Sequence, residues 1–593
     1  MKKFLLIFIS ISLLLTSVFP AFAEEPGSEE TFFYIVHTND IHGYYKATGR
    51  GQLGFEKLKS VADAYDAQLL LDAGDTFHGQ AFATIEQGKS IAQLMDFVGY
   101  DAVVPGNHDF SYGAEQIKEW DREQDFKILA CNIEADDGSA YFEEPYLIKE
   151  ITADNGSTLK VGVLGVTDDA FAASKAPENI AGLKFLEETR QASETAESLR
   201  AAGCDIVIAL SHLADCKAFA KNTRGIDIVI AGHEHQLINE SCSNLDGEPV
   251  YVTQSGHYFQ AIGVLKVSYD SQTGKAKAVT GTQLTAENIE ETFDEQTAEQ
   301  ISLIEERQAD ILDTQIGSSS REYPYSWGEI RTKEQEIGRI VTGAYLNATG
   351  ADVAIENAGG LRAGIPQGSI TYHDIISISP YGNYIVTLKL TGEQILNIIE
   401  HSLEIGMQCS KVYALQIAAV EAGEDPYQYS WPDNSGSYLQ FGGIRLQYDP
   451  SRPEGSRVVS VCIGKEALET KKIYTVATNN YVVADDDYPC LSEAEILCEY
   501  GTCEQALIRF IKAEDFEKAA VAEEISVYVP SEKTPEPTLS ATPNPTSDKK
   551  TAPTPEKVAS PDTGDHTILL WSPLLISGLF LSLTLVKGTK RQK

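Results

Sequence analysis

Four short apolar runs in this chain each end in a cluster of polar residues of the kind that bind metal ions. The runs occupy positions 34–36, 69–71, 103–104 and 228–230, and the clusters after them read HTNDIHG, DAGDTFHG, PGNHDF and AGHEHQ. Runs of aliphatic and β-branched residues are typical of buried parallel strands, and ligands of open α/β sheets collect at the carboxyl ends of such strands. We therefore expect the four clusters to meet in one place.

The clusters combine imidazole, carboxylate and amide side chains. With His212, which follows the apolar run 206–208, the candidate residues are Asp40, His42, Asp75, Asn107, His108, His233 and His235. This mixture suits zinc, manganese, iron or cobalt better than calcium, which prefers oxygen ligands alone. A pair of such ions about 3.5–4 Å apart serves the hydrolysis of phosphate esters, because it contacts both the attacking and the leaving oxygen. The sequence therefore predicts a dinuclear metal site.

A simpler interpretation exists for each residue taken alone. A single His or Asp at a strand end is more often a turn former or a helix cap than a metal ligand. The chain has only 11 His, and four clusters of this kind favour metal binding over coincidence.

The order of the clusters, DxH, GD, GNHD, a single His and then GHxH, resembles that of the calcineurin-like metallophosphatases. The segments NAGGLRAGIPQGSITYHDI and SPYGNYIVTLKLTG resemble the second domain of the bacterial 5'-nucleotidases. The resemblance covers residues 31–528 and implies an α/β fold. A four-layer metallophosphatase β-sandwich domain flanked by helices would be joined by a helix to an α/β C-terminal nucleotide-binding domain.

The resemblance also implies two divalent metal ions, such as zinc or manganese. One ion would be held by Asp40, His42, Asp75 and His235, and the other by Asp75, Asn107, His212 and His233. His108 would lie beside the scissile phosphate, where it could stabilise the developing charge or protonate the leaving oxygen. Asn107 would also contact the substrate.

The chain departs from the family pattern three positions after His108. Relatives commonly carry an acidic residue there that orients the catalytic ring, whereas this chain has Ser111. A hydroxyl can accept a hydrogen bond but supplies no charge that favours imidazolium. Two alternatives remain open: Asp109 takes the orienting role, or His108 works at a lower pKa.

The second domain carries the candidate substrate-binding residues. A predicted strand at 353–355 ends in ENAGGLR, where Arg362 offers a guanidinium fork for a phosphate or a carboxylate. The resemblance implies a slot for the base, with Tyr438 and Phe441 from GSYLQFGG and Tyr488 from NNYVVADDDYP. Each aromatic face that holds a base contributes about 1–3 kcal/mol. The alternatives are a surface arginine after a tight turn and ordinary core aromatics.

The domain boundaries follow from composition and pattern, and the identities of the two domains are those that the family resemblance implies. We expect a signal peptide at 1–23, the metallophosphatase domain at 24–290, an interdomain helix at 291–316 and the 5'-nucleotidase C-terminal domain at 317–528. A stalk rich in Pro, Thr and Ser follows at 529–566, then a transmembrane segment at 567–586 and a basic tail at 587–593. The stalk is too poor in large apolar residues to form a packed core.

The pentapeptide SPDTG before the last apolar segment resembles a cell-wall sorting signal of Gram-positive surface proteins. A sortase would cut after Thr563 and join it to peptidoglycan. The alternative is a plain membrane anchor. Both interpretations place the protein outside the cell, at the surface of a Gram-positive bacterium.

The charge of the chain limits its partners. Asp and Glu number 87 against 47 Lys and Arg, a formal net charge of −40, which disfavours binding of nucleic acid polymers. We expect an extracellular phosphohydrolase of small nucleotides, with nucleoside 5'-monophosphates as first candidates. The alternatives are a 2',3'-cyclic nucleotide phosphodiesterase, a nucleotide-sugar hydrolase and, from another class, a catalytically decayed surface protein that binds nucleotides or serves adhesion.

Overall fold

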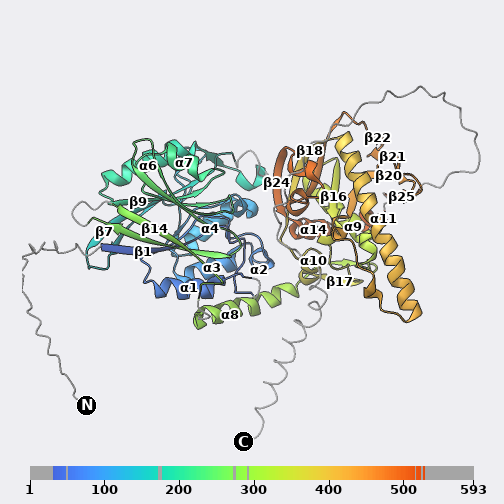
Figure 1. The fold of residues 1–593 in the computed structure, drawn as a ribbon, viewed down its shortest axis with the longest axis horizontal. Coiled ribbons are helices and arrows are strands. Elements are labelled where there is room, and N and C mark those ends of the chain that lie inside the picture. The colour runs from blue at the N-terminus through green and yellow to red at the C-terminus, as the bar shows by residue number, and fades with distance from the viewer. Residues whose placement is uncertain are drawn as a thin grey trace, which may run out of the picture. The chain divides into compact units, whose positions relative to one another are not determined.

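The computed structural model describes residues 31–48, 51–170, 177–270, 276–289, 293–513, 516–521 and 525–527. The chain divides into two compact units, Met1–Ile311 and Leu312–Lys593 (Figure 1). The expected signal peptide, SPDTG motif, apolar segment 567–586 and basic tail lie outside the described residues, as does the whole of the expected stalk. Among the described helices, none combines the length and the apolar character that crossing a membrane requires.

The first unit contains two six-stranded mixed sheets. One has the order β14-β13-β1-β2-β3-β4. Its strands are β1 (Thr31–Thr38), β2 (Leu69–Asp72), β3 (Ala102–Val103), β4 (Lys127–Ile128), β13 (Ala261–Tyr269) and β14 (Ala276–Thr285). Strands β1 to β4 run parallel, and β13 pairs antiparallel with β1. The first three apolar runs of the sequence therefore lie side by side, as their pattern predicted.

The second sheet has the order β11-β12-β10-β9-β7-β6. Its strands are β6 (Tyr146–Thr152), β7 (Thr158–Thr167), β9 (Ile206–His212), β10 (Ile228–Gly232), β11 (Leu237–Ser243) and β12 (Pro249–Ser255). Strands β7, β9, β10 and β12 run parallel, and β6 and β11 pair antiparallel at the two edges. A separate pair joins β5 (Ile133–Ala135) to β8 (Leu183–Phe185).

Helices cover the outer face of each sheet. Figure 1 shows α1 and α3 on one side of the unit and α6 and α7 on the other. The helices are α1 (Gly54–Ala64), α2 (Ala81–Thr84), α3 (Lys89–Val98), α4 (Ala114–Glu123), α6 (Glu188–Ala201) and α7 (Cys216–Asn222), with the 3₁₀ turns η1 (His108–Tyr112) and η2 (Pro177–Ile180).

The buried side chains of the first unit form three cores, one for each interface between layers. Leu70 packs with the residues of α1 and α3, whereas its neighbour Leu71 packs with Ile208 and Ile230 of the other sheet. This split follows from the two-residue period of a strand, which sends successive side chains to opposite faces. A third core lies between the second sheet and α6 and α7. The four-layer architecture predicted from the sequence is confirmed.

Helix α8 (Glu295–Leu312) is shorter than the predicted interdomain helix at 291–316. It begins after Asp294, whose carboxylate accepts hydrogen bonds of 2.7 Å from the amide and the hydroxyl of Thr297. It ends before β15 (Gln315–Ser319), which pairs with β17 (Gly368–Thr371). The predicted end of the helix at residue 316 was wrong, because residues 315–319 form a strand that pairs with β17. Ile301 and Ile304 are buried in the core of the first unit, as their helical spacing indicated.

The second unit is built on a five-stranded mixed sheet in the order β19-β16-β23-β18-β24. Its strands are β16 (Val353–Asn357), β18 (Tyr384–Thr391), β19 (Leu439–Gly442), β23 (Ile473–Asn479) and β24 (Ile496–Thr502). A second sheet, in the order β22-β21-β20-β25, contains β20 (Ile444–Tyr448), β21 (Val458–Ile463), β22 (Glu466–Ala467) and β25 (Ile525–Val527).

The helices of the second unit begin with clear local signals. They are α9 (Glu336–Thr349), α10 (Tyr372–Ile378), α11 (Gly392–Ala422), α12 (Asn480–Val483), α13 (Pro489–Ser492), α14 (Cys503–Lys512) and α15 (Phe516–Val521), with the 3₁₀ turns η3 (Glu329–Arg331), η4 (Ala358–Gly360), η5 (Pro426–Gln428) and η6 (Ser435–Ser437). Thr371, Thr391 and Thr502 open α10, α11 and α14 with capping boxes, in which side chain and backbone satisfy each other's first-turn groups.

Candidate metal centre

The carboxyl ends of the parallel strands in both sheets of the first unit carry the predicted ligands. Asp40 and His42 follow β1, Asp75 follows β2, and Asn107 follows β3. His212 is the last residue of β9, and His233 and His235 follow β10. Side chains separated by about two hundred positions therefore gather at one end of the two sheets.

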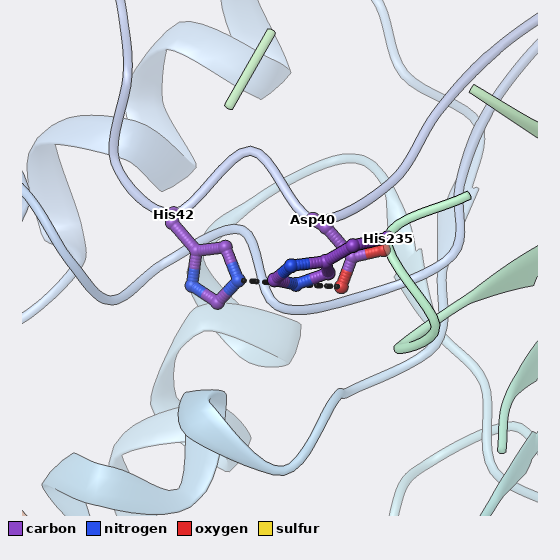
Figure 2. A group of neighbouring side chains, drawn as sticks. All are labelled: Asp40, His42 and His235. Atoms are coloured by element: carbon purple, nitrogen blue, oxygen red, sulfur yellow. Dashed lines mark hydrogen bonds and ion pairs between the residues drawn. The ribbon is translucent and has the colours of Figure 1, made fainter. Parts of the chain in front are cut away.

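Asp40, His42 and His235 form the first group. Their candidate ligand atoms lie within 4.8 Å of one another. Figure 2 shows the rings of His42 and His235 turned toward each other, next to the carboxylate of Asp40. The two Nε2 atoms are 3.2 Å apart, and Asp40 Oδ1 lies 3.5 Å from His235 Nε2. The edges of three ligating side chains thus face a common point.

Asp75, His212 and His233 form the second group, again with candidate ligand atoms within 4.8 Å of one another. Asn107 belongs to it as well, because its Oδ1 lies 3.3 Å from His212 Nε2 and 3.1 Å from His233 Nδ1. The first group contains three of the four residues that the family resemblance implied for one ion, and the second group with Asn107 contains the four implied for the other.

Asp75 connects the two groups through one oxygen. Its Oδ2 lies 3.3 Å from His212 Nε2 in the second group and 3.9 Å from His42 Nε2 in the first. Its Oδ1 accepts a hydrogen bond of 2.7 Å from the backbone amide of His108. The carboxylate is therefore oriented by the backbone on one side and faces imidazole nitrogens on the other.

The ligand loops have an unusual backbone conformation. The φ angles of five candidate ligands lie between 49° and 80°, namely those of Asp40, His42, Asp75, His233 and His235. Side chains other than glycine adopt this left-handed region at an energetic cost, and such residues cluster at functional sites. Hydrogen bonds between the loops after β1 and β2 hold the conformation, since the amides of Asp40 and His42 donate to the carbonyls of Gly74 and Asp75, each at 2.8 Å.

Two glycines make room for the ligands. A Cβ on Gly106 would collide with the carboxylate of Asp75, and a Cβ on Gly232 would lie 2.8 Å from His212 Nδ1. Larger residues at these positions would displace the ligand side chains.

Neighbouring polar groups orient the ligands. The Nδ1 atom of His212 lies 2.7 Å from the carbonyl oxygen of Ala73, so a proton on Nδ1 leaves Nε2 free to face the site. Asn39 donates to Asp40 Oδ2 at 2.7 Å, and its own Oδ1 accepts hydrogen bonds from the amide and hydroxyl of Ser255. Such outer contacts are typical of residues that hold metal ions.

The electrostatics of the centre fit cations. Burial opposes ionisation of Asp75, but His212, His108 and His42 outweigh it and hold the pKa of Asp75 well below its usual range. Burial likewise disfavours charge on His212, yet Asp75 and Asp40 raise its pKa to about 10. Carboxylates that hold protons on neighbouring imidazoles can hold a divalent ion instead, with release of the proton. The nitrogen and oxygen donors present therefore fit divalent metal ions.

Asp109 does not contact the site as a catalytic residue would. Its oxygens accept hydrogen bonds from four backbone amides, those of Asp75, Thr76, Phe77 and Gly106, at 2.8–3.1 Å. The prediction that Asp109 orients the ring of His108 is corrected, because these bonds use both carboxylate oxygens to fix the loop after β2. Ser111 is buried, and its hydroxyl brings no charge to the site.

His108 lies at the edge of both metal groups. It is 7% exposed, its Nε2 lies 3.9 Å from Asp75 Oδ2, and its ring centroid lies 5.3 Å from that of His42. The ring of His78 packs nearly parallel to it, with 5.8 Å between centroids and 19° between planes. His78 belongs to the DAGDTFHG cluster and was not recognised from the sequence as part of the site.

A sixth strand end was also missed. After β12, His257 stacks on the ring of His235 with 4.7 Å between centroids and 12° between planes. Tyr258 packs edge-on against His42, and its amide donates to the carbonyl of Asp40 at 2.7 Å. The segment QSGHY follows an apolar run as the other clusters do, so a signal was present. It lacks a carboxylate and therefore did not look like a ligand cluster.

Arg362 in the second unit is positioned by an aromatic neighbour. Its Nε donates a hydrogen bond of 2.7 Å to the hydroxyl of Tyr381, and its guanidinium lies 5.4 Å from the centroid of the same ring. Tyr381 is 40% exposed. The pair presents a cation and a polar aromatic edge near the end of β16.

The three aromatic residues predicted to hold a base are core residues. Tyr438, Phe441 and Tyr488 are only 3%, 2% and 2% exposed. A Cβ on Gly406 of α11 would lie 2.6 Å from the ring of Tyr438, and the hydroxyl of Tyr488 donates to the carbonyl of Ser437 at 2.7 Å. The predicted stacking role of these rings finds no support in this structure, because all three are buried, with Tyr438 against Gly406 of α11 and Tyr488 bonded to Ser437 of η6.

Comparison with known proteins agrees with this geometry. The model for the calcineurin-like phosphoesterases matches residues 33–237, and the model for the 5'-nucleotidase C-terminal domain matches residues 315–493.

Two curated relatives match along most of the chain. The chain is 26% identical over 512 residues to the trifunctional nucleotide phosphoesterase protein YfkN of Bacillus subtilis, an alignment that covers 78% of this chain but only 32% of that longer protein. It is 24% identical over 533 residues to protein UshA of Yersinia enterocolitica, which covers 79% of this chain and 90% of UshA.

Among solved structures, the NAD nucleotidase of Haemophilus influenzae matches with a TM-score of 0.64 at 21% identity. This match covers 84% of this chain and 99% of that one. At this identity, the likeness concerns the fold.

Proposed function

Because the chain belongs to the family that joins a calcineurin-like phosphoesterase domain to a 5'-nucleotidase C-terminal domain, we propose that it releases phosphate from nucleoside 5'-monophosphates with two divalent metal ions. The observation that carries the proposal is the pair of ligand groups linked by Asp75 Oδ2. Relatives named as nucleotide phosphoesterases and 5'-nucleotidases support the substrate class.

Each ligand group would bind one of the two ions. Asp40, His42 and His235 would hold one ion, His212, His233 and Asn107 would hold the other, and Asp75 would contact both. When bound, the ions supply positive charge at the phosphate oxygens and at the attacking and leaving groups. The buried carboxylates Asp40 and Asp75 provide the negative charge that retains them.

His108 is the candidate proton donor. Its ring lies beside Asp75 and His42 without belonging to either metal group, so an N–H on Nε2 can reach an oxygen of a phosphate held there. Donation to a non-bridging oxygen stabilises charge, and donation to the bridging oxygen assists departure of the nucleoside. The ring of His78, stacked on that of His108, limits rotation of the His108 ring.

In the second unit, Arg362 is the candidate residue for binding an anionic group of the substrate. A guanidinium held by Tyr381 is preorganised to take a carboxylate or phosphate oxygen, which reduces the entropy lost on binding. The base-binding surface is to be sought among exposed side chains, since Tyr438, Phe441 and Tyr488 are buried.

The test is a substrate panel with purified protein and added manganese or zinc. Substrate consumption, followed by chromatography of the products, should be fastest for AMP, compared with 2',3'-cyclic AMP, 3',5'-cyclic AMP and UDP-glucose. Preference for a cyclic nucleotide or for UDP-glucose would replace the 5'-nucleotidase assignment with one of the alternative hydrolases. Metal binding without turnover of any substrate would support a decayed binding protein instead.

We also propose that the protein is exported and attached to the cell wall through Thr563. This part of the proposal rests on the sequence alone, on residues 1–23 and on SPDTG before the apolar segment 567–586. Full-length protein expressed in a Gram-positive host should be released by a peptidoglycan hydrolase. It should stay with the membrane in a host without sortase. Recovery of the protein in the membrane fraction of both hosts would favour a plain membrane anchor.

A further inference from the structure

The second half of helix α11 is largely exposed although its sequence is apolar. The buried residues of α11 lie within Gly392–Cys409, except for Ala419. Figure 1 shows this helix reaching past the sheet that contains β16. After the buried part, Leu415, Ile417 and Val420 are 46%, 44% and 62% exposed. A helix that is apolar around most of its circumference is normally covered by other protein, so this surface is a candidate for a partner.

One side of this segment is covered by the chain itself, which returns along the helix after residue 423. Nε2 of Gln416 donates a hydrogen bond of 2.7 Å to the carbonyl of Tyr429, and Nε1 of Trp431 donates one of 3.0 Å to Oε1 of Gln416. The ring of Tyr413 packs against that of Trp431, with 5.9 Å between centroids. The side that carries Gln416 is therefore fixed to the second unit, and the opposite side is the open one.

The open side carries a short apolar stripe between two opposite charges. Its four central residues are all exposed and follow the three- and four-residue spacing of one helix face, namely Lys411, Ala414, Ala418 and Glu421. Leu415 and Ile417 border this stripe on its two flanks. Along the helix axis the lysine and the glutamate are about 15 Å apart. A positive end is thus joined to a negative end by apolar side chains.

The stripe has the same pattern when it is read in the reverse direction. About Gln416, Ala414 is the counterpart of Ala418, and Lys411 is the counterpart of Glu421, with the opposite charge. In an antiparallel pair related by a two-fold axis, each residue of one copy faces its counterpart on the other. A parallel pair in register would place Lys411 against Lys411, and like charges repel. The charges therefore favour the antiparallel arrangement.

We propose that the open side of α11, residues 411–421, binds the same side of a second copy of this chain. The small side chains of Ala414 and Ala418 let the two helix axes approach to about 8 Å. Leu415 then packs beside Leu415 of the other copy on one flank, and Ile417 packs in the same way on the other flank, which removes both from water. The contact covers a short length of helix, so the dimer is weak and reversible. This pairing goes beyond the proposed function and does not depend on the chemistry of the metal centre.

Charge reversal tests the pairing at two exposed positions, where folding tolerates the change. In Lys411→Glu a glutamate faces Glu421 of the other copy, and in Glu421→Lys two lysines face each other. Sedimentation velocity of the full chain in detergent, over a range of micromolar concentrations, measures dimerisation. We expect each single reversal to raise Kd at least about tenfold, and the double variant Lys411→Glu/Glu421→Lys to return it to within about threefold of the wild-type value.

A mixture of the two single variants tests the antiparallel register. A mixed pair brings a glutamate against a lysine at both ends of the stripe, so we expect the mixture to dimerise with about the wild-type Kd. Ile417→Lys places a charge on the apolar flank and should also raise Kd about tenfold or more. Ile473→Lys changes an isoleucine that is 61% exposed elsewhere in the same unit, and this matched control should leave Kd unchanged.

Three results would overturn the proposal. The first is a wild-type chain that stays monomeric over the whole range of concentrations. The second is a dimer whose Kd is the same in wild type and in both single reversals, since the copies would then meet through another surface. The third is a mixture of the two reversals that dimerises no better than either variant alone, because the antiparallel register requires its recovery.

Discussion

The backbone amide of His108 donates a hydrogen bond of 2.7 Å to Oδ1 of Asp75. This bond joins the candidate catalytic residue to the carboxylate that faces both metal groups, so the loops after β2 and β3 hold each other in place. Asp109 strengthens the same junction from the other side, through the amides of residues 75–77. The position of Asp75 relative to His108 is therefore set by backbone contacts.

Replacement of Asp75 by Asn should weaken binding of both ions. The amide keeps the shape of the side chain but removes the negative charge that faces His42 and His212. We expect kcat/KM for AMP to fall more than about 100-fold, since changes in outer contacts of metal ligands already cost about 10–100-fold. Metal content measured by mass spectrometry should fall below one ion per chain. The exposed Asp63→Asn is the control, and full metal content with normal turnover would contradict a shared carboxylate.

His108→Ala should separate catalysis from metal binding. Loss of a general acid lowers turnover by about 10²–10⁴-fold, and here both ions should remain because the ring lies outside the two ligand groups. The measurements are kcat for AMP and metal content of the same preparation. His373→Ala, on the surface of the second unit, is the matched control. Loss of metal from His108→Ala would show that His108 is a ligand.

His257→Ala should loosen the first group, because the ring that packs on His235 is lost. We expect affinity for the ion of the first group to fall about 10-fold, as for other outer contacts of metal ligands. His257→Phe keeps a flat ring and should restore most of the affinity. Titration with a chelating dye measures both variants. Equal losses in Ala and Phe would mean that a ring nitrogen, rather than stacking, is what His235 needs.

The metal centre could be predicted from the sequence because each ligand lies within a few residues of a strand end, so a local pattern carries the information. The base slot could not be predicted in this way. Whether Tyr438 or Tyr488 shows a face to solvent depends on α11, whose Gly406 lets the helix approach the ring of Tyr438. Likewise, no periodicity tells whether the carboxylate of Asp109 meets the ring of His108 or four backbone amides.

Tyr488 should contribute to the free energy of unfolding. Its ring is buried, and truncation of a buried aromatic residue costs about 3–5 kcal/mol. We expect Tyr488→Ala to lower the free energy of unfolding by this amount and Tyr488→Phe by about 1 kcal/mol, since the latter keeps the ring and loses the hydrogen bonds of the hydroxyl, among them that to the carbonyl of Ser437. Urea unfolding measures both. Tyr481→Ala changes a 58% exposed ring in the same segment and is the control. A stable Tyr488→Ala that binds nucleotide weakly would restore the stacking role.

The buried carboxyl group of Glu356 should make the stability of the folded chain depend on pH. Its side chain is 1% exposed at the end of β16, where Tyr345 and Asn479 donate hydrogen bonds of 2.6 and 2.9 Å to Oε2. Burial disfavours the carboxylate more than these bonds favour it, and the pKa of Glu356 is raised from 4.5 to about 7. Between these two values the folded chain retains a proton that the unfolded chain releases. Stability therefore falls as pH rises through this window and does not change further above it.

Glu356→Gln removes this titration while it keeps an oxygen that can accept the bond from Tyr345. The difference in unfolding free energy between variant and wild type should grow in favour of the variant from about pH 4.5 to pH 7, by at most about 3 kcal/mol, and then level off. Urea unfolding of both proteins at pH 5, 6, 7 and 8 measures the difference, in which the other titrating groups cancel. Glu454→Gln, an exposed change in the same unit, is the matched control. A difference for Glu356→Gln that does not vary with pH would mean that the buried carboxyl group is ionised throughout, held by Tyr345 and Asn479 alone.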